Sequence, residues 1–400
     1  MIRLKLRACC WGGVLLTRSK SADGGKVVVW DLPTRLFHWL LAGMFAVAWF
    51  THEDDRYLDV HVFAGYVFFG LLLFRMLWGF VGGYYARFRE FGYRWTNARD
   101  YLRATLRGPS RRYLGHNPAG SWVVFLMLGL GLAISFTGMF VLGAEERHGP
   151  FAGAFSFAHA TLFHLLHEAS AVGLLVVVAF HLTGVAYESW RHRENLAGAM
   201  VTGRKRGPGV DAVIFRGVGA LLLAGVAVSA IVQFAGHVRA TPEKPYLPFT
   251  GPTLPDSALW RAECGSCHLA FHPTLLPLRS WEALLAGQRD HFGDDLALDA
   301  ATLAGLRDFY TPNAAESALT EAAWKTDRSI PPGETPLRIT ETEYWKRKHR
   351  DISQRTWERD PVRTKANCAA CHLDAEQGTF EDAAMRPPGP QTDQSRPKTR

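Results

Sequence analysis

Long apolar runs in the first part of the chain restrict its fold more than any other feature. Five runs are long enough to cross the ~30 Å hydrocarbon core of a bilayer as helices: residues 35–51, 60–81, 122–143, 161–187 and 212–235. After about residue 235 the sequence becomes charged and is interrupted by prolines. The pattern therefore predicts an all-α protein, with five transmembrane helices followed by a mostly helical globular part.

Arginines cluster in two loops and predict how the membrane part is oriented. Residues 82–121 hold eight arginines against Glu90 and Asp100, and the segment after the fourth run, "RHRENLAGAMVTGRKRGPG", is also basic, whereas "THEDDRYLD" after the first run is acidic. Because loops rich in Lys and Arg stay in the cytoplasm, we expect a cytoplasmic N-terminus and a periplasmic C-terminal part in a bacterial inner membrane. The formal net charge of +8 follows from this topology, so we expect no nucleic-acid partner.

Two copies of the motif Cys-x-x-Cys-His lie in the C-terminal part, as "CGSCH" at 264–268 and "CAACH" at 368–372. In this motif two thiols bind the vinyl groups of a haem, and the histidine ligates the iron. A four-thiolate zinc site is the weaker alternative, because the two cysteine pairs are far apart and zinc does not require the following histidine. We therefore expect two covalently bound c-type haems, attached at Cys264 and Cys267 and at Cys368 and Cys371, with His268 and His372 as iron ligands.

Four histidines lie at membrane depth, where ionisable side chains usually mark function. His167 and His181 are 14 residues apart, so they differ by about 40° around a helix axis and by about 21 Å along it. His38 lies near the inner start of the first run and His61 near the outer start of the second. We therefore expect two b-type haems, one between His38 and His181 and one between His61 and His167.

Other side chains in the membrane part leave alternatives open. His164 competes with His167 but is turned by about 260° from His181, and a single buried histidine can instead form a hydrogen bond between helices. Arg35 and Arg75 are either haem propionate contacts or plain anchors at the membrane surface. Glycines that could let a flat ring approach a helix are Gly65, Gly129, Gly131, Gly138, Gly173 and Gly184.

Residues 26–206 resemble the prokaryotic cytochrome b561 family, which includes the cytochrome b subunits of nickel-iron hydrogenases. The likeness rests on "VVVWDLPTRLFHWLL", "YLGHNPAGSW" and "LLHEASAVGLLVVVAFHLTGV". The resemblance implies a four-helix core with two b haems that passes electrons between a quinone pool and another carrier. The family's ligand pattern falls on His38, His61, His167 and His181. His116 also matches, but it lies in a cytoplasmic loop, which we expect it to order.

Residues 259–385 resemble the dihaem cytochromes c, through "ECGSCHLAFHPTLLPLRSWEALLAGQRDHFGDD" and "NCAACHLDAEQGTFED". The resemblance implies His291 and His349 as distal ligands. Methionine does not occur between residues 201 and 384, which also favours histidine. The simplest pairing by proximity is His268 with His291 and His372 with His349. His272 is too close in sequence to His268 to reach around the ring, so we expect it at the surface.

The predicted organisation is a cytoplasmic leader at 1–25, a cytochrome b561-type membrane domain at 26–206, a fifth transmembrane helix at 207–235, a linker at 236–258, a periplasmic dihaem cytochrome c domain at 259–385 and a disordered tail at 386–400. We expect the first apolar run to be a retained signal anchor, and Cys9 and Cys10 in the leader to have no metal role.

These features predict a membrane-bound electron-transfer protein with four haems. We expect it to connect the quinone pool, through the b haems, with a periplasmic redox carrier, through the c haems, and a quinol:cytochrome c-type oxidoreductase activity stays open. The alternatives are a cytochrome subunit of a hydrogenase-like oxidoreductase complex, or a superoxide or quinone oxidoreductase. Expected partners are membrane lipid, quinone and a periplasmic redox protein or oxidoreductase subunit, with a homo-oligomer left open. The direction of electron flow depends on haem exposure and hydrogen bonding, which the sequence does not fix.

Overall fold

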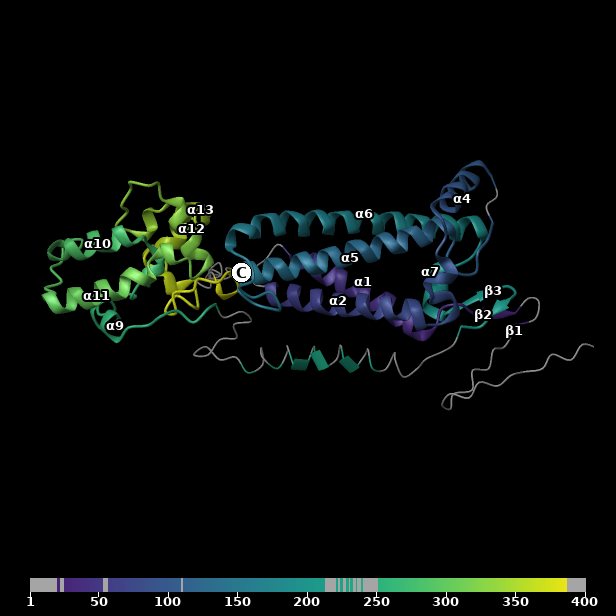
Figure 1. Ribbon diagram of the computed structural model, residues 1–400, viewed down its shortest axis with the longest axis horizontal. Coiled ribbons are helices and arrows are strands. Elements are labelled where there is room, and N and C mark those ends of the chain that lie inside the picture. Colours follow the sequence, from purple (N-terminus) through teal and green to yellow (C-terminus); the bar gives the residue numbers. More distant parts are fainter. Residues whose placement is uncertain are drawn as a thin grey trace, which may run out of the picture. The chain divides into compact units, whose positions relative to one another are not determined.

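A computed structural model describes residues 25–52, 57–108, 111–212 and 251–386, together with residues 20–21 and a few positions between 221 and 239 (Figure 1). The described part is mostly helical, with only short strands. About half of the predicted fifth span at 207–235 lies outside the described residues, as do most of the leader, with Cys9 and Cys10, most of the first part of the linker and nearly all of the tail.

The described residues belong to two compact units. The first unit contains residues up to 46, residues 65–135 and residues 168–232; the second contains residues 47–64, 136–167 and those from 233 onward. The boundaries at residues 46/47, 64/65, 135/136 and 167/168 fall within the four long apolar helices described next. Each of these helices therefore has one end in each unit.

The four longest helices in the described part cover the first four apolar runs. They are α1 (Leu32–Phe50), α2 (Leu58–Val81), α5 (Pro118–Ala144) and α6 (Ala160–His192). The helical segments Leu58–Val81, Pro118–Ala144 and Phe157–His192 are long and apolar enough to cross a membrane, and α1 is not among these three. The sequence thus predicted the positions of these helices correctly.

Large apolar side chains point outward from the long helices. Leu77 and Phe80 of α2 and Phe180 of α6 are each 69% exposed, and Leu182 is 61% exposed. A helix that is apolar on all sides is stable at the surface only when its surroundings are apolar as well. The exposed side chains therefore fit contact with lipid.

Side chains from the four long helices pack into one cluster within the first unit. Its buried members are Phe68 and Leu72 of α2, Leu128 of α5 and Leu174 of α6, and Leu41, Met44 and Phe45 of α1 pack against them. A Cβ atom on Gly131 would lie 2.9 Å from Leu72 Cδ1, so this glycine lets α5 approach α2 closely.

A buried carboxylate, Asp31, joins the start of α1 to the end of α2. Its Oδ1 accepts a hydrogen bond from the Thr34 backbone N–H at 2.9 Å, which caps the first turn of α1. Its Oδ2 accepts from Trp78 Nε1 and from the Gly83 backbone N–H, both at 3.2 Å. The side chain is 1% exposed, so these bonds offset the cost of burying its charge.

Short strands close the same end of the first unit. Strand β2 (Lys26–Val28) pairs antiparallel with β3 (Arg204–Arg206), and β1 (Lys20–Ser21) pairs with β4 (Gly209–Val210). The chain just before α1 is thereby fixed to the chain that follows α6. Short helices in this unit are η2 (Tyr84–Ala86), α3 (Phe88–Phe91), α4 (Trp95–Arg107) and α7 (Leu196–Thr202).

The C-terminal part of the second unit consists of short helices and turns. Its α-helices are α9 (Ala258–Cys264), α10 (Leu278–Ala286), α11 (Ala300–Asn313), α12 (Glu321–Ser329), α13 (Glu343–Lys348) and α14 (Gln354–Glu358). Its 3₁₀ turns are η4 (Pro273–Leu275), η5 (Gln288–Asp290), η6 (Ala315–Ser317), η7 (Ile339–Glu341), η8 (Cys368–Ala370) and η9 (Asp382–Ala384), while η3 (Phe157–His159) precedes α6.

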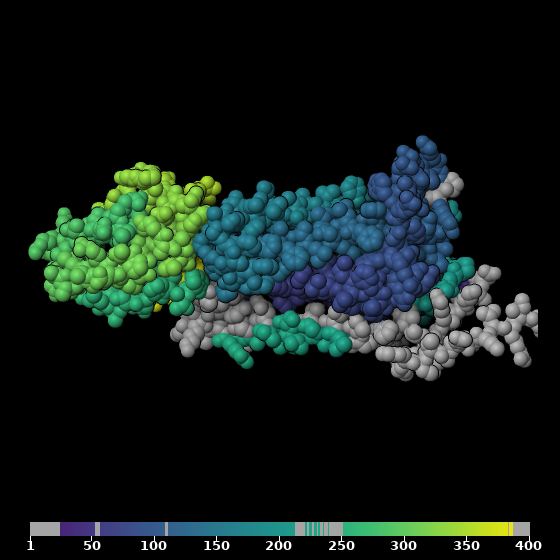
Figure 2. Space-filling model, in the orientation of Figure 1, coloured from purple at the N-terminus to yellow at the C-terminus, as the bar shows by residue number. Residues whose placement is uncertain are grey.

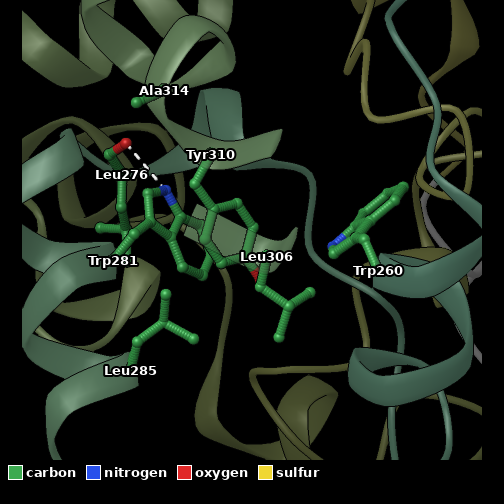
Figure 3. Close-up of a cluster of buried hydrophobic side chains, with 7 residues drawn as sticks. All are labelled: Trp260, Leu276, Trp281, Leu285, Leu306, Tyr310 and Ala314. Carbon is green, nitrogen blue, oxygen red and sulfur yellow. Dashed lines mark hydrogen bonds between the residues drawn. The ribbon is translucent and has the colours of Figure 1, made fainter. Parts of the chain in front are cut away.

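A buried apolar cluster holds α9, α10 and α11 together (Figure 3). Trp281 and Tyr310 stack with their ring centroids 4.9 Å apart, and Trp281 Nε1 donates hydrogen bonds to the carbonyl oxygens of Pro273 and Leu276. The Tyr310 hydroxyl lies 3.2 Å from Cys264 Sγ. The cluster therefore positions the first Cys-x-x-Cys-His motif as well as the helices.

We predict that Leu306→Ala will destabilise the C-terminal part strongly. Leu306 is fully buried in the cluster, and replacing a buried leucine by alanine leaves a cavity and costs about 2–5 kcal/mol. Denaturant unfolding of the full chain in detergent, followed by tryptophan fluorescence, measures this loss. Leu337→Ala is the control, because Leu337 is 41% exposed; equal losses for both variants would contradict the assigned core.

Candidate functional site

The eight histidines predicted to bind iron lie in four pairs of neighbouring rings. Ring centroids are 6.3 Å apart for His38 and His181, 6.0 Å for His61 and His167, 6.4 Å for His268 and His291, and 6.2 Å for His349 and His372. Two imidazoles that bind one metal ion from opposite sides, each nitrogen about 2 Å from it, have centroids about 6 Å apart. All four spacings therefore fit an iron between two axial histidines.

The first pair lies within the first unit, between α1 and α6. His38 is in the second turn of α1, and its Nδ1 is buried with no hydrogen-bond partner among the described residues. Arg35, one turn earlier, donates from its guanidinium to the Val201 carbonyl oxygen at 2.5 Å. Arg75 of α2 is 4% exposed, and its guanidinium lies over the rings of Phe88 and Phe91.

The second pair lies within the second unit, where neighbouring groups orient both rings. His61 Nδ1 lies 2.9 Å from the Ala48 carbonyl oxygen, so Nδ1–H donates to this oxygen and leaves Nε2 available to a metal. His167 Nδ1 lies 3.3 Å from Thr137 Oγ1. A Cβ atom on Gly138 would lie only 2.9 Å from His167 Cε1, so this glycine makes room for the ring.

His164, the alternative to His167, has different surroundings. Its Nε2 lies 2.6 Å from Glu145 Oε2, and its side chain is 46% exposed. A ring held by a carboxylate at the helix surface is poorly placed to share an iron with His61. The structure therefore gives no support to the His164 alternative.

The two pairs of the C-terminal part are also oriented by backbone carbonyls. His268 Nδ1 lies 2.7 Å from the Leu269 oxygen, and His349 Nδ1 lies 2.8 Å from the Trp345 oxygen. Burial lowers the pKa of His291, His349 and His372, which favours the neutral imidazole that a metal requires. Among the described residues, no group of three or more His, Cys, Asp or Glu side chains gathers as a zinc site would need.

The prediction that His272 lies at the surface is wrong. His272 is 2% exposed, and its Nδ1 and Nε2 lie 3.0 Å from Thr274 Oγ1 and from the Pro255 carbonyl oxygen. The turn η4 folds the chain back after the first haem motif, so the His272 ring packs edge-on against Trp260. Because both ring nitrogens have partners, His272 stabilises this turn and is not placed to bind iron.

His116 packs inside the loop before α5. Its ring centroid lies 4.9 Å from that of Trp30 and 4.3 Å from that of Phe91. Burial, with a smaller contribution from the positive charges of Arg75 and Lys205, lowers the pKa of His116 to about 3. The neutral ring fits the role of ordering the loop.

A pair of buried carboxyl groups, Glu146 and Glu381, is a feature that the sequence analysis missed. Glu146 follows α5 and Glu381 precedes η9; they are 8% and 7% exposed, and their side chains form a hydrogen bond. Burial raises the pKa of both groups, that of Glu381 to about 7, and the negative charges of Glu321 and Asp382 add to this effect. The raised pKa values of both groups favour a state in which the two carboxyl groups share one proton. They are far apart in the sequence, so no local sequence pattern predicts their contact.

Two family models match separate parts of the chain. Residues 29–203 match the model described as prokaryotic cytochrome b561, and residues 260–380 match the model described as dihaem cytochrome c. The chain thus contains a cytochrome b561-type part and a dihaem cytochrome c-type part. It is therefore a membrane electron-transfer cytochrome with haem cofactors, as the sequence analysis predicted.

Relatives are found for both parts. A "Probable Ni/Fe-hydrogenase B-type cytochrome subunit" of Rhizobium leguminosarum bv. viciae is 25% identical over 221 residues, which cover 46% of this chain and 91% of the relative. A protein of the same description from Azotobacter chroococcum mcd 1 is 28% identical over 211 residues, covering 44% and 87%. A diheme cytochrome c of Rhodobacter sphaeroides is 41% identical over 32% of this chain and 100% of that chain, with a TM-score of 0.29. One from Shewanella baltica OS155 is 33% identical over 34% and 96%, with a TM-score of 0.28.

We predict that His61→Ala will remove one b-type haem, because the remaining His167 ring offers only one axial ligand. The measurement is the ratio of b-type to c-type haem in the purified full chain, from its absorbance bands. His164→Ala is the matched control, since His164 lies one turn from His167 but pairs with Glu145, and it should keep full haem content. Retention of all b-type haem by His61→Ala would contradict the assignment.

We also predict that the contact between Glu146 and Glu381 opens as pH rises. A raised pKa means that the folded state favours the protonated form, so its contribution to stability is present in acid and is lost as pH rises through about 7. Hydrogen exchange of residues 379–386, corrected for its intrinsic pH dependence, should accelerate on the order of tenfold from about pH 6 to about pH 8. Glu146→Gln, a neutral donor at every pH, should abolish the change. Glu376→Gln at the exposed Glu376 should keep it, and a pH response that survives Glu146→Gln would contradict the shared proton.

Proposed function

We propose that this protein transfers electrons between quinone in a bacterial inner membrane and a periplasmic redox carrier, through two b-type and two c-type haems. The observation that carries the proposal is the set of four histidine pairs, with ring centroids 6.0–6.4 Å apart. Two pairs lie in the part that matches the cytochrome b561 model and two in the part that matches the dihaem cytochrome c model.

Each haem would be held by residues that the chain supplies from separate segments. His38 with His181 and His61 with His167 would ligate the b-type haems. Cys264 and Cys267, with His268 and His291, would hold one c-type haem; Cys368 and Cys371, with His349 and His372, would hold the other. Haem bound in this way supplies reversible one-electron transfer. Two histidines per iron would leave no open position, which would favour electron transfer over reaction with oxygen or superoxide.

Arg75 supports a haem close to the first pair. A buried guanidinium without a partner is costly, yet one nitrogen of Arg75 has no hydrogen-bond partner among the described residues. The Asp31 carboxylate lies within electrostatic reach, but its own hydrogen bonds go to Thr34, Trp78 and Gly83. A haem propionate would supply the missing acceptor. Arg35, whose buried Nε also lacks a partner there, is the second propionate contact in this proposal.

The proposed topology follows from charge and helix length. We place α1 in the membrane as a fourth span beside α2, α5 and α6, which gives a four-helix bundle at residues 26–206. A fifth span at 207–235 and a linker at 236–258 would then carry the dihaem part, 259–385, to the periplasm. The arginines of residues 82–121 support a cytoplasmic position for that loop. Covalent haem attachment fits the periplasm, where thiols meet an oxidising environment.

In the proposed direction, a quinol that is oxidised to quinone gives up two electrons and two protons. The electrons leave one at a time, since each haem accepts one, and end on the periplasmic carrier. The protons leave to water on the side of the membrane where the quinol reacts. The same set of ligands can serve the opposite direction, from a periplasmic donor to quinone.

A second candidate is a cytochrome subunit of a hydrogenase-like oxidoreductase complex. Two of the relatives named above favour it, since they are described as probable Ni/Fe-hydrogenase B-type cytochrome subunits. These relatives match less than half of this chain, and a separate family model matches the dihaem part, residues 260–380. Co-purification of a second large subunit with the native chain would favour this candidate.

We predict that a quinol will reduce the b-type and the c-type haems of the purified full chain in detergent. Absorbance spectra before and after addition of quinol measure this reduction, and dithionite gives the full amplitude of both sets of bands. His61→Ala should lose most reduction of the c-type bands by quinol while dithionite still reduces them, because a haem between quinol and the c-type haems is missing.

The opposite result would assign a different direction or partner. If quinol leaves both sets of bands oxidised while dithionite reduces them, electrons enter from a periplasmic donor or from a partner subunit. His164→Ala should behave as the unaltered chain, which separates loss of the electron path from general damage to the bundle.

A further inference from the structure

Helix α4 exposes a narrow apolar stripe. Trp95, Leu102 and Leu106 are 59%, 46% and 86% exposed. Since a helix turns by about 100° per residue, these three side chains lie within about 40° of one another. Three large apolar side chains aligned along one helix and left uncovered by the described chain mark a surface that contacts something apolar.

Side-chain hydrogen bonds fix which face of α4 points outward. Ala98 and Tyr101 are buried, and the Tyr101 hydroxyl donates to Glu188 Oε1 of α6 at 2.9 Å. The Tyr187 hydroxyl of α6 donates to the Thr105 carbonyl oxygen at 3.3 Å. These contacts anchor α4 to the end of α6, so the apolar stripe is held outward by the fold.

Arginines flank the stripe. Arg99 and Arg103 lie about 40° and 80° around the helix from Trp95, and Arg107 ends the helix. Asp100 is the only acidic residue of α4, and its ion pair with Arg99 joins two exposed side chains, so it contributes little. An apolar stripe beside arginines is typical of a helix that lies in the plane of an anionic membrane surface.

The stripe continues onto a helix that spans the membrane. The rings of Trp95 and Trp122 are in contact, with centroids 5.6 Å apart, and Trp122 lies in the second turn of α5. Trp122 Nε1 donates to the Tyr93 carbonyl oxygen at 3.1 Å, and Leu126, one turn further along α5, is 52% exposed. Tryptophans gather where a helix leaves the bilayer. This continuity favours lipid as the occupant of the stripe.

We propose that α4 lies in the membrane–water interface and binds anionic phospholipid headgroups. Its arginines contact the headgroup phosphates, while Trp95, Leu102 and Leu106 enter the boundary with the acyl chains. Figure 1 shows α4 projecting to the side where α5 begins and α6 ends, and Figure 2 shows its surface uncovered on the face in view. The inference rests on the membrane position of α5 and α6 and not on the proposed electron transfer.

The test measures the depth of single spin labels on α4. Full-length chains with Cys9 and Cys10 replaced by serine carry one label at Leu102→Cys, Leu106→Cys or Ala104→Cys, where Ala104 is exposed on the opposite face of the helix. They are reconstituted in phosphatidylcholine vesicles with or without phosphatidylglycerol. Full haem content shows that each variant is folded. Collision with oxygen, which favours lipid, is compared with collision with a water-soluble nickel chelate.

The oxygen-to-nickel ratio should be at least about threefold higher at positions 102 and 106 than at position 104. Phosphatidylglycerol should raise the ratio at 106 further, and Arg99→Gln with Arg103→Gln or high salt should remove that rise. Equal ratios at 104 and 106 would overturn the proposal and leave a protein partner as the occupant. A high ratio at 106 that ignores phosphatidylglycerol would overturn the role given to the arginines. Quinol reduction of the haems is measured on the same samples, so failure of the proposed function stays distinguishable.

Discussion

The proposed haem sites depend on holding two imidazole rings about 6 Å apart, each ring coming from a different segment of the chain. In the membrane part, α6 supplies one ring to each pair, His167 and His181, while α1 and α2 supply His38 and His61. A shift of α6 by one residue would turn both of its rings by about 100°. Both pairs therefore depend on the same helix register, which the packing of Leu174 between α2 and α5 helps to fix.

The pairs of the C-terminal part depend on a different kind of support. Their rings lie in turns or at the ends of short helices, which alone would be too flexible to hold a ligand. Burial of Trp260, Trp281 and Leu306 fixes α9, α10 and α11, and bonds from Nδ1 of His268 and His349 to backbone oxygens orient the rings. In the C-terminal part, an apolar core and backbone hydrogen-bond acceptors hold the rings in position, whereas in the membrane part the long helices do so.

The sequence predicted the helices, and the placement of His167 and His181 on nearly one face, because both follow from regular patterns along the chain. Apolar length located the helices, and the 14-residue separation of His167 and His181 placed both rings on nearly one face. The Cys-x-x-Cys-His motifs are local signals, so their chemistry needed no fold. In each of these cases one stretch of sequence carried the whole signal.

The contacts that the sequence did not predict join residues far apart in the chain or depend on a tight turn. His272 was expected at the surface, because its burial depends on how η4 folds back against Trp260. The carbonyl oxygen of Ala48 that faces His61 and the pair Glu146 and Glu381 leave no local pattern. The Ni/Fe-hydrogenase B-type relatives named above match less than half of this chain, whereas here one chain carries both a cytochrome b561-type part and a dihaem part. A covalent link gives two modules an effective concentration of about millimolar when the link can span them. In the proposed function, electron transfer between the parts would then be an intramolecular step, and its rate would not depend on how much of the protein the membrane contains.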